Sequence, residues 1–251
     1  MAGRVDLGWL TARPIAHRGL HGMAPGVVEN CPRAFEAAIA GRYAIECDVQ
    51  PTADGDAVVF HDGTLDRLTQ ASGRVDALPA AALKTLAFKA TDDRMITLSE
   101  LFALVAGRVP LVVEIKSEFD GKLGLTKTVA ALAAAYAGPV ALMSFDPGPI
   151  AWLKENAPGL VRGIVAESHY AGAHWERLPA AMRTDLAALG HMERTDPDFL
   201  SWRVADLPSV ATERFRGSMK RPVICWTVRT DDERVIAARH ADQVTFEGYL
   251  A

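Results

Sequence analysis

Side chains that could do acid–base or metal chemistry gather where four short apolar runs of the sequence end. They are His17 and Arg18, Glu46 and Asp48, His61, and Glu114 and Lys116. A β-strand sends alternate side chains to opposite faces, so residues two positions apart point the same way. If the four runs end at one edge of a sheet, their side chains meet there. We therefore expect a single catalytic mouth.

Three of these side chains are carboxylates, from Glu46, Asp48 and Glu114. Burying like charges together is strongly unfavourable unless a cation lies among them. Hard divalent ions prefer carboxylate and water oxygens, and no histidine or cysteine is expected on the same face, which argues against a structural zinc site. The sequence therefore predicts one divalent cation, Mg²⁺ or Ca²⁺, held by the three acids.

Apolar runs rich in Val, Ile and Leu alternate with stretches of helical periodicity, a pattern typical of parallel strands joined by helices. Eight such runs predict an α/β fold of the TIM-type (β/α)8 barrel class, in which functional residues lie at the carboxyl ends of the strands. The expected strands are 14–18, 44–48, 110–115, 140–144, 160–165, 198–202, 222–227 and 242–246. The expected helices are 32–41, 97–107, 124–137, 147–156, 175–189, 206–216 and 231–240.

A hairpin is expected after the second strand. Thr52-Ala-Asp-Gly55 is a turn signal, and residues 58–61 would form a return arm that brings His61 to the same mouth as Asp48. Residues 62–96 are too long for an ordinary connection and are interpreted as a small insertion over the mouth. Few residues follow the last strand, so the eighth helix is expected to be missing, and residues 6–12 are expected to cover the bottom of the barrel.

Length and composition narrow the class of protein. The 251 residues fit a single catalytic barrel domain, 1–251. A balance of 27 basic against 31 acidic residues, with no Lys/Arg-rich run, argues against a nucleic-acid partner. The sequence has no uncharged apolar stretch of about 18 residues, so no membrane span is predicted. Three cysteines without CxxC spacing favour a reducing compartment, and we expect the cytoplasm. The oligomeric state stays open.

Several short motifs occur together in one order. They are His17-Arg-Gly19, Glu29-Asn30, Glu46-x-Asp48, His61-Asp62, Leu65-Asp66-Arg67, Glu114-x-Lys116 and Cys225-Trp-Thr-Val228. With them the sequence resembles the glycerophosphodiester phosphodiesterase family over nearly its full length. The resemblance implies a TIM-type barrel that hydrolyses a small-molecule glycerophosphodiester to glycerol 3-phosphate and an alcohol with a bound divalent cation. The site residues it implies are Glu46, Asp48 and Glu114 for the metal, His17 and His61 as acid and base, and Arg18 and Lys116 for phosphate.

The chemistry of this family accounts for these residue types. Arg18 can bind two phosphate oxygens with its planar fork, and Lys116 adds a point charge. A pair of histidines can take one proton and give another in a single turnover. Which histidine is the acid stays open. The attacking group is water or a glycerol hydroxyl next to the phosphate, and the second, cyclic route is the preferred hypothesis.

Some positions depart from the family or allow two interpretations. Val28 replaces a proline before the Glu29-Asn30 pair, which concerns the shape of that loop. The last strand of the family commonly ends in Thr-Asp followed closely by proline, whereas this sequence reads Thr245-Phe-Glu-Gly-Tyr249, which concerns substrate selection. Trp226 either stacks beside the glycerol or fills the top of the barrel. Glu29 and Asn30 are expected to hold the mouth loop by helix capping, with a contact from Asn30 to the phosphate as the alternative. The histidines outside the motifs are interpreted as surface or loop residues; they are His21, His169, His174, His191 and His240.

Two alternatives to the main hypothesis remain. The same site could act on lysophospholipids or sugar phosphodiesters, and an apolar groove beside the mouth would favour a lysophospholipid. A catalytically silent barrel could instead bind phosphorylated ligands. The retention of all the acids, histidines and cations argues against a silent barrel, because such a protein has no physical need for that buried charge.

Overall fold

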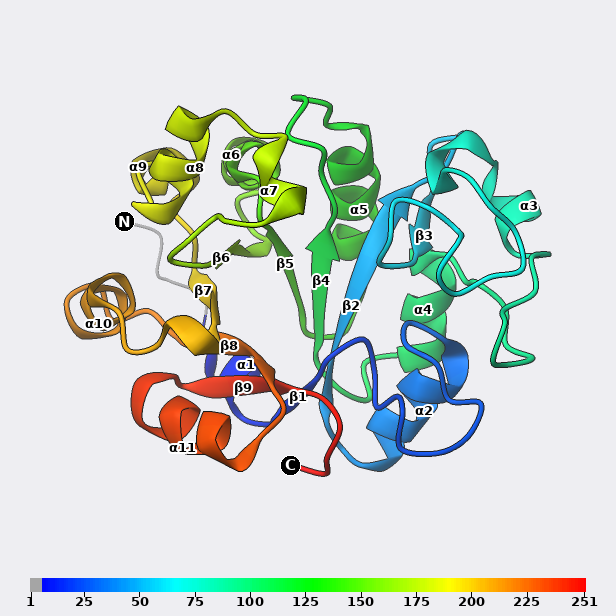
Figure 1. The fold of residues 1–251 in the computed structure, drawn as a ribbon, viewed down its shortest axis with the longest axis horizontal. Helices are drawn as coiled ribbons and strands as arrows, with labels where there is room; N and C mark the ends of the chain where they lie inside the picture. Colours follow the sequence, from blue (N-terminus) through cyan, green and yellow to red (C-terminus); the bar gives the residue numbers. More distant parts are fainter. Residues whose placement is uncertain (1–5) are drawn as a thin grey trace.

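Eight parallel strands close into a barrel in the computed structural model, which describes residues 6–251 (Figure 1). The ring closes because β1 pairs with β2 on one side and with β9 on the other. The barrel strands are β1 (Ile15–Ala16), β2 (Ala44–Pro51), β4 (Leu111–Ile115), β5 (Val140–Ser144), β6 (Val161–Ala166), β7 (Phe199–Arg203), β8 (Val223–Val228) and β9 (Gln243–Phe246). Every one of these strands overlaps one of the expected ranges, and their bounds differ from those ranges by at most a few residues. The TIM-barrel prediction is therefore confirmed.

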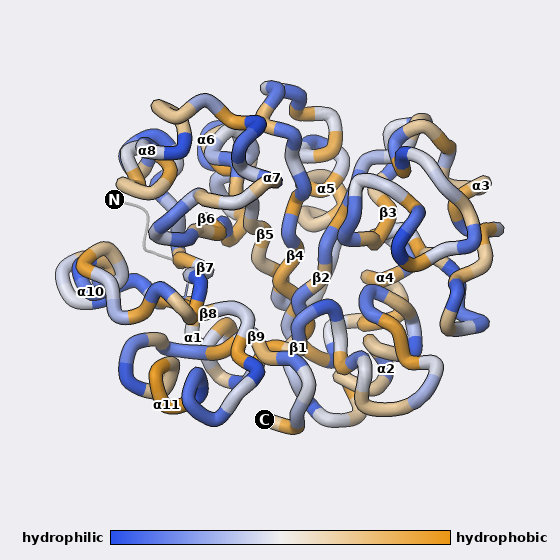
Figure 2. The backbone as a smooth tube through the Cα atoms, viewed as in Figure 1, coloured by the Kyte–Doolittle hydropathy of each residue, from blue (hydrophilic) through white to orange (hydrophobic). Residues whose placement is uncertain are grey.

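The strands form because both of their faces are buried. Along β4, Val112 points into the barrel and packs with Met143, whereas Val113 packs outward against the layer of helices. Cys47 on β2 belongs to the same outer layer, which confirms that it faces away from the acids. Figure 2 shows hydrophobic residues along the central strands and hydrophilic residues on the outer loops. Such a continuous apolar run is the pattern of a parallel strand covered on both sides.

Six helices cover the outside of the barrel. They are α2 (Pro32–Ala40), α4 (Leu98–Val105), α5 (Gly124–Ala135), α6 (Pro147–Asn156), α10 (Val210–Gly217) and α11 (Asp231–His240). Thr97 and Glu100 form a capping box at the start of α4, and Asp146 accepts a hydrogen bond from the Gly148 N–H before Pro147 opens α6. Among residues 6–251, no helix is long and apolar enough to cross a bilayer.

Two expected helices differ in the structure. The single helix predicted over 175–189 is wrong: this crossover holds three short helices, α7 (Ala173–Glu176), α8 (Ala180–Ala187) and α9 (Met192–Thr195). Pro179 interrupts it, because a proline offers no N–H for a helical hydrogen bond. The helix predicted from residue 206 begins at Val210 instead. Ser209 caps it, and a 3₁₀ turn, η2 (Val204–Asp206), precedes Pro208.

The predicted hairpin is present. β3 (Ala57–Val59) returns antiparallel to β2, with Val59 opposite Val49. Residues 62–96 then form η1 (Val75–Ala77) and α3 (Ala80–Leu83) around a small apolar cluster of their own, beside β3 in Figure 1. At the other end of the barrel, α1 (Gly8–Thr11) inserts Leu10 into the interior beside Ile15, as expected for a bottom cover. No helix follows β9 in residues 247–251.

His191 lies at the start of α9 and is buried, contrary to its interpretation as a surface or loop residue. Its Nδ1 lies 3.4 Å from the Thr195 hydroxyl, and its Nε2 has no hydrogen-bond partner among residues 6–251. Burial lowers the pKa of His191 to about 4 from its ordinary 6.5. Below pH 6.5 the unfolded chain therefore binds a proton here that the folded protein does not, and the free energy of unfolding falls as the pH approaches 4.

Replacing His191 with glutamine, which stays neutral, should remove this acid sensitivity. We expect the wild type to lose on the order of 3 kcal/mol more stability than the variant between pH 7 and pH 4. Urea unfolding across this pH range measures the difference. The exposed His169→Gln serves as the control and should follow the wild type. Parallel stability profiles for the wild type and His191→Gln would contradict the prediction.

Candidate active site

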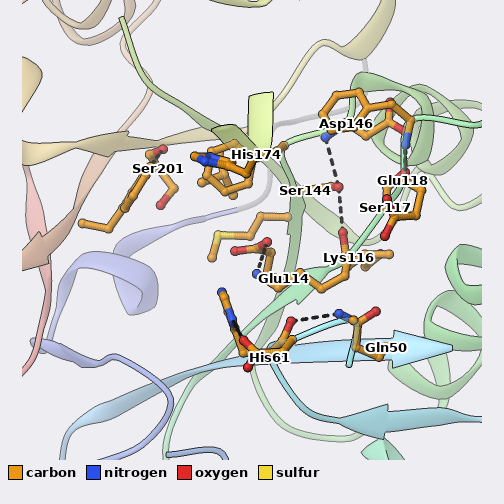
Figure 3. A pocket seen from close by; sticks show the side chains of 18 of the residues that line it. Gln50, His61, Glu114, Lys116, Ser117, Glu118, Ser144, Asp146, His174 and Ser201 are labelled. Atoms are coloured by element: carbon orange, nitrogen blue, oxygen red, sulfur yellow. Dashed lines mark hydrogen bonds and ion pairs between the residues drawn. The ribbon is translucent and has the colours of Figure 1, made fainter. Parts of the chain in front are cut away.

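A cavity of about 1240 Å³ opens at the carboxyl ends of the barrel strands. The predicted site residues His17, Arg18, Glu46, His61, Glu114, Lys116 and Trp226 all line it. Asp48 lies just behind this wall, where Lys116 binds it. Figure 3 shows Glu114 and Lys116 between His61 and the Ser144–Asp146 segment. The structure therefore brings together residues that lie on, or directly after, β1, β2, β3, β4 and β8.

The three carboxylates predicted to hold a metal form one buried group. Glu46 and Asp48 lie on β2, and Glu114 lies opposite Asp48 on β4. The exposed fractions are only 2 % for Glu46, 1 % for Asp48 and 7 % for Glu114. One carboxylate oxygen from each residue lies within 4.8 Å of the others. The alternation of side chains along two neighbouring parallel strands produces this convergence.

Two cationic side chains partly neutralise this group. The Lys116 Nζ lies 2.7 Å from Asp48 Oδ1 and 2.6 Å from Glu114 Oε1, and the Arg18 Nε lies 3.2 Å from Asp48 Oδ2. Burial opposes the ionisation of Asp48, but Lys116, followed by the two site histidines and Arg18, keeps its pKa below the usual range. Asp48 is therefore an anion at neutral pH.

Glu46 is the carboxylate that this pairing leaves out. Its Oε2 accepts a hydrogen bond of 3.0 Å from the Arg18 backbone N–H, and no lysine or arginine side chain in residues 6–251 forms an ion pair with it. Burial, with the charges of Asp48 and Glu114, raises the pKa of Glu46 well above its usual value. A cation that binds all three oxygens would relieve this repulsion, so the group is suited to a divalent ion.

His17 follows β1 and is held by a residue that the sequence did not predict. Its Nδ1 lies 2.9 Å from Glu247 Oε2, and its Nε2 lies 4.0 Å from Glu46 Oε2. Burial lowers the pKa of His17, although Glu247 opposes that shift. The hydrogen bond with His17 lowers the pKa of Glu247 to about 2. A neutral His17 that donates its Nδ1 proton to Glu247 presents the Nε2 lone pair toward the acids.

His61 follows β3 and is held in a similar way. Its Nδ1 lies 2.7 Å from Asp62 Oδ1, and the Arg67 Nε donates to Asp62 Oδ2 at 2.6 Å. Burial alone would raise the pKa of Asp62. Its contacts with His61 and Arg67 outweigh burial and hold that pKa below its usual value. The Gln50 amide donates to the His61 backbone carbonyl (Figure 3). The Nε2 of His61 is therefore the nitrogen free to face a ligand.

The loop before α2 has a different role from the one predicted. Glu29 and Asn30 do not cap this helix, which begins at Pro32 after the N-cap residue Cys31. Glu29 accepts hydrogen bonds from Arg18 and Arg67 instead. The Asn30 amide donates to Asp48 Oδ2 at 2.9 Å, so Asn30 helps to orient a member of the acidic group. The capping expectation failed because these side chains pair with residues distant in sequence.

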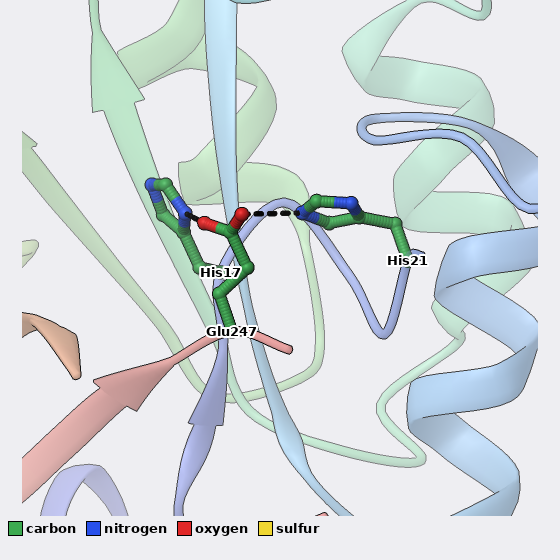
Figure 4. A group of neighbouring side chains, drawn as sticks. All are labelled: His17, His21 and Glu247. Carbon is green, nitrogen blue, oxygen red and sulfur yellow. Dashed lines mark hydrogen bonds and ion pairs between the residues drawn. The ribbon is translucent and has the colours of Figure 1, made fainter. Parts of the chain in front are cut away.

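Aromatic side chains form the wall of the cavity away from the acids. Trp226 donates from its indole N–H to the Ser201 carbonyl, and its ring packs edge-on against Phe145 at 5.5 Å. Trp175 and Phe119 continue this surface. His174, interpreted from sequence as a surface or loop residue, is exposed and also lines the cavity. His21 lies 4.0 Å from Glu247 (Figure 4).

Comparisons with known proteins agree with this geometry. A sequence profile described as the glycerophosphoryl diester phosphodiesterase family matches residues 17–244. A glycerophosphodiester phosphodiesterase of Caldanaerobacter subterraneus subsp. tengcongensis is 34% identical over 161 residues, which are 60% of this chain and 65% of that protein. The match thus spans a little less than two thirds of that curated relative.

Solved structures share the fold. A phosphodiesterase of Oleispira antarctica, in complex with the product sn-glycerol-3-phosphate, superposes with a TM-score of 0.76 at 22% identity, covering 95% of this chain and 94% of that one. A glycerophosphodiester phosphodiesterase of Thermotoga maritima gives a TM-score of 0.70 at 22% identity, with 92% of both chains covered. At this identity the likeness concerns the barrel itself.

Proposed function

Because the chain belongs to the glycerophosphoryl diester phosphodiesterase family, we propose that it hydrolyses glycerophosphodiesters to glycerol 3-phosphate and an alcohol. One observation carries the proposal. Two imidazoles, each held by its own carboxylate, line the same cavity as three buried acids whose ligand atoms lie within 4.8 Å of one another. The Oleispira antarctica phosphodiesterase, which has the same fold, binds the product sn-glycerol-3-phosphate, and this supports the substrate class.

The acidic group would hold Mg²⁺ or Ca²⁺ through oxygens of Glu46, Asp48 and Glu114, because these ions prefer oxygen ligands. When bound, the cation would polarise a phosphoryl oxygen and offset negative charge. Arg18 and Lys116 line the cavity beside the acids, and we assign them to the phosphate. Glu29 anchors Arg18 through Nη1, which orients its guanidinium group. Both cations would bind more tightly as charge builds up on the phosphoryl oxygens.

We assign His17 as the base and His61 as the acid. His17 is neutral because burial lowers its pKa, and its Nδ1 proton is engaged by Glu247. Its Nε2 can therefore accept the proton of the attacking hydroxyl. His61 would deliver a proton from Nε2 to the departing alkoxide, while Asp62 fixes the orientation of the ring. Glu247 and Asp62 are positioning residues in this scheme.

The direct test is release of glycerol 3-phosphate from glycerophosphocholine with and without a chelator. We expect release by the wild-type protein, loss of activity after chelation, and recovery when Mg²⁺ or Ca²⁺ is added back, because the buried acids cannot organise the site without a cation. Comparing the two ions in the same assay identifies the one that the site uses. Release that continues unchanged in excess chelator would rule out the proposed site chemistry.

The aromatic wall favours a second candidate substrate, a lysophospholipid. Phe119, Phe145 and Trp175 line the cavity, and the space exceeds what glycerol 3-phosphate alone needs. An acyl chain lying on this surface would gain about 0.8 kcal/mol for each buried methylene. Comparing kcat/KM for lysophosphatidylcholine and glycerophosphocholine separates the two classes. A rate for the lysophospholipid no higher than background would exclude it.

We also propose that residues 1–251 act as one catalytic domain, with the insertion at 62–96 shaping one side of the mouth. Gly63, Arg74 and Asp76 of the insertion line the cavity, which supports a role in selecting the alcohol. The three cysteines are free thiols buried in the fold, which suits the reducing cytoplasm.

A further inference from the structure

A second cluster of metal-ligating side chains lies at the edge of the cavity. His17, His21 and Glu247 each offer one ligand atom, and these atoms lie within 4.8 Å of one another. Figure 4 shows the Glu247 carboxylate between the two imidazole rings. The His17 Nδ1 lies 2.9 Å from Glu247 Oε2, and the His21 Nε2 lies 4.0 Å from Glu247 Oε1. The cluster thus combines two imidazole nitrogens with one carboxylate.

His21 has a feature that the proposed hydrolysis does not explain. Its Nε2 is buried and has no hydrogen-bond partner among residues 6–251, although buried polar atoms are normally paired. The nitrogen faces Glu247 across a gap too long for a hydrogen bond. Both imidazoles turn a ring nitrogen toward the same Glu247 carboxylate, which is the arrangement that a shared metal ion would need.

We propose that His17, His21 and Glu247 form a second metal site, which takes a transition-metal ion such as Zn²⁺ and is distinct from the acidic group. Two imidazoles and one carboxylate are a ligand set that zinc uses, with the fourth position open to water. Hard ions prefer all-oxygen sites, so Mg²⁺ or Ca²⁺ at the acids would not compete for the imidazoles.

Two neighbouring guanidinium groups, of Arg18 and Arg229, oppose this site. Arg18 is already paired with Glu29 and Asp48. The Arg229 Nη2 donates to Glu247 Oε2 at 2.9 Å, and a guanidinium repels an incoming cation. However, the Arg229 side chain is 53% exposed, so it can turn into solvent when a metal binds. Zinc ligands lie about 2.0–2.2 Å from the ion. Since the three ligand atoms already lie within 4.8 Å of one another, small side-chain movements would bring them to that distance. Arg229 therefore weakens the site without blocking it.

Occupation of this site inhibits hydrolysis, a consequence that rests on the proposed function. In the metal-free ring the proton lies on Nδ1, and Nε2 holds the lone pair that accepts a proton. A metal on Nδ1 takes the lone pair freed when that single proton leaves, and solvent relays the proton to Nε2, so the metal-bound neutral ring is the Nε2–H tautomer. The nitrogen that should act as the base becomes a donor. The metal thus fixes His17 in the wrong tautomer.

The test uses full-length protein saturated with Mg²⁺ and titrated with Co²⁺, whose visible spectrum reports coordination. We expect bands of a four-coordinate ion with nitrogen ligands for the wild type, and at least about tenfold weaker binding for His21→Gln, because loss of a ligand should cost no less than loss of an outer-shell partner. Activity assays in excess Mg²⁺ should show inhibition by Zn²⁺. His21→Gln should keep its basal rate and resist Zn²⁺ at least about tenfold better. His169→Gln, at an exposed residue outside the cluster, is the matched control.

Two results would overturn the proposal. Equal sensitivity of His21→Gln and wild type to Zn²⁺ would place the inhibition at the acidic group. A Co²⁺ titration without nitrogen-ligand bands would show that the cluster binds no transition metal. The spectroscopic arm needs no substrate, so it decides the metal site even if glycerophosphodiesters are not hydrolysed. Thermal denaturation of His21→Gln checks that the variant is folded.

Discussion

Replacing His17 with alanine is expected to lower kcat for glycerophosphocholine by about 10²–10⁴-fold, the range that a positioned acid or base contributes. The His17 side chain is only 13% exposed, its Nδ1 is held by Glu247, and its Nε2 lies 4.0 Å from Glu46 Oε2. No other histidine in the described part of the chain has this placement. KM should change much less than kcat, because binding of the phosphate falls to Arg18 and Lys116.

Steady-state kinetics with glycerol 3-phosphate as the measured product give both constants. His61→Ala should fall in the same range, since both proton transfers belong to one turnover. The exposed His169→Ala is the control and should keep the wild-type rate. Thermal denaturation shows whether the variants fold. A folded His17→Ala that retains more than a tenth of the wild-type kcat would remove His17 from the catalytic role.

Replacing Glu46 with glutamine should separate activity from stability. Glutamine keeps the shape of the side chain and can accept the hydrogen bond from the Arg18 backbone N–H, but it has no charge to offer a cation. We expect activity at the metal concentration that suits the wild type to fall by more than about 100-fold, beyond what an outer-shell partner contributes. In chelator, the variant should unfold at a higher temperature than the wild type, because the repulsion among three buried acids is relieved.

Calorimetric metal titration and thermal denaturation in chelator measure the two effects. Glu118→Gln is a matched control, because Glu118 lines the cavity but pairs with Arg177 at the exposed rim. It should leave metal affinity and stability close to those of the wild type. A Glu46→Gln protein with unchanged metal affinity would show that the cation does not bind at the acidic group.

The parts of the fold set by local pattern were predictable. The barrel strands stand out because they are mostly apolar, as Leu111–Ile115 shows. The turn from Thr52 to Gly55 indicated that the chain doubles back into the return arm. Alternation along β2 and β4 was enough to bring Glu46, Asp48 and Glu114 together. The crossover between β6 and β7 was not predictable, because Pro179 and Gly190 break its periodicity into pieces too short to recognise.

The partners of the site residues could not be read from sequence. Glu247 lies 230 residues from His17, and Arg67 lies 38 residues from Glu29, so neither pair leaves a local signal. Only the closure of the barrel brings β9 beside β1. One signal was available: Glu247 follows directly on the last strand, where a barrel places its functional groups. A search for carboxylates at all eight strand ends would have included it.

β1 is the shortest strand of the barrel. Its two residues, Ile15 and Ala16, pair with β2 on one side and with β9 on the other, and so close the barrel. His17 follows directly after β1. Both β1 residues are buried, but only two residue pairs hold each side of β1, and segments held by few contacts open at lower free energy than the whole protein. In rising guanidinium, catalysis should therefore vanish while circular dichroism still reports an intact set of helices, so enzyme assays would understate how much of the chain remains folded.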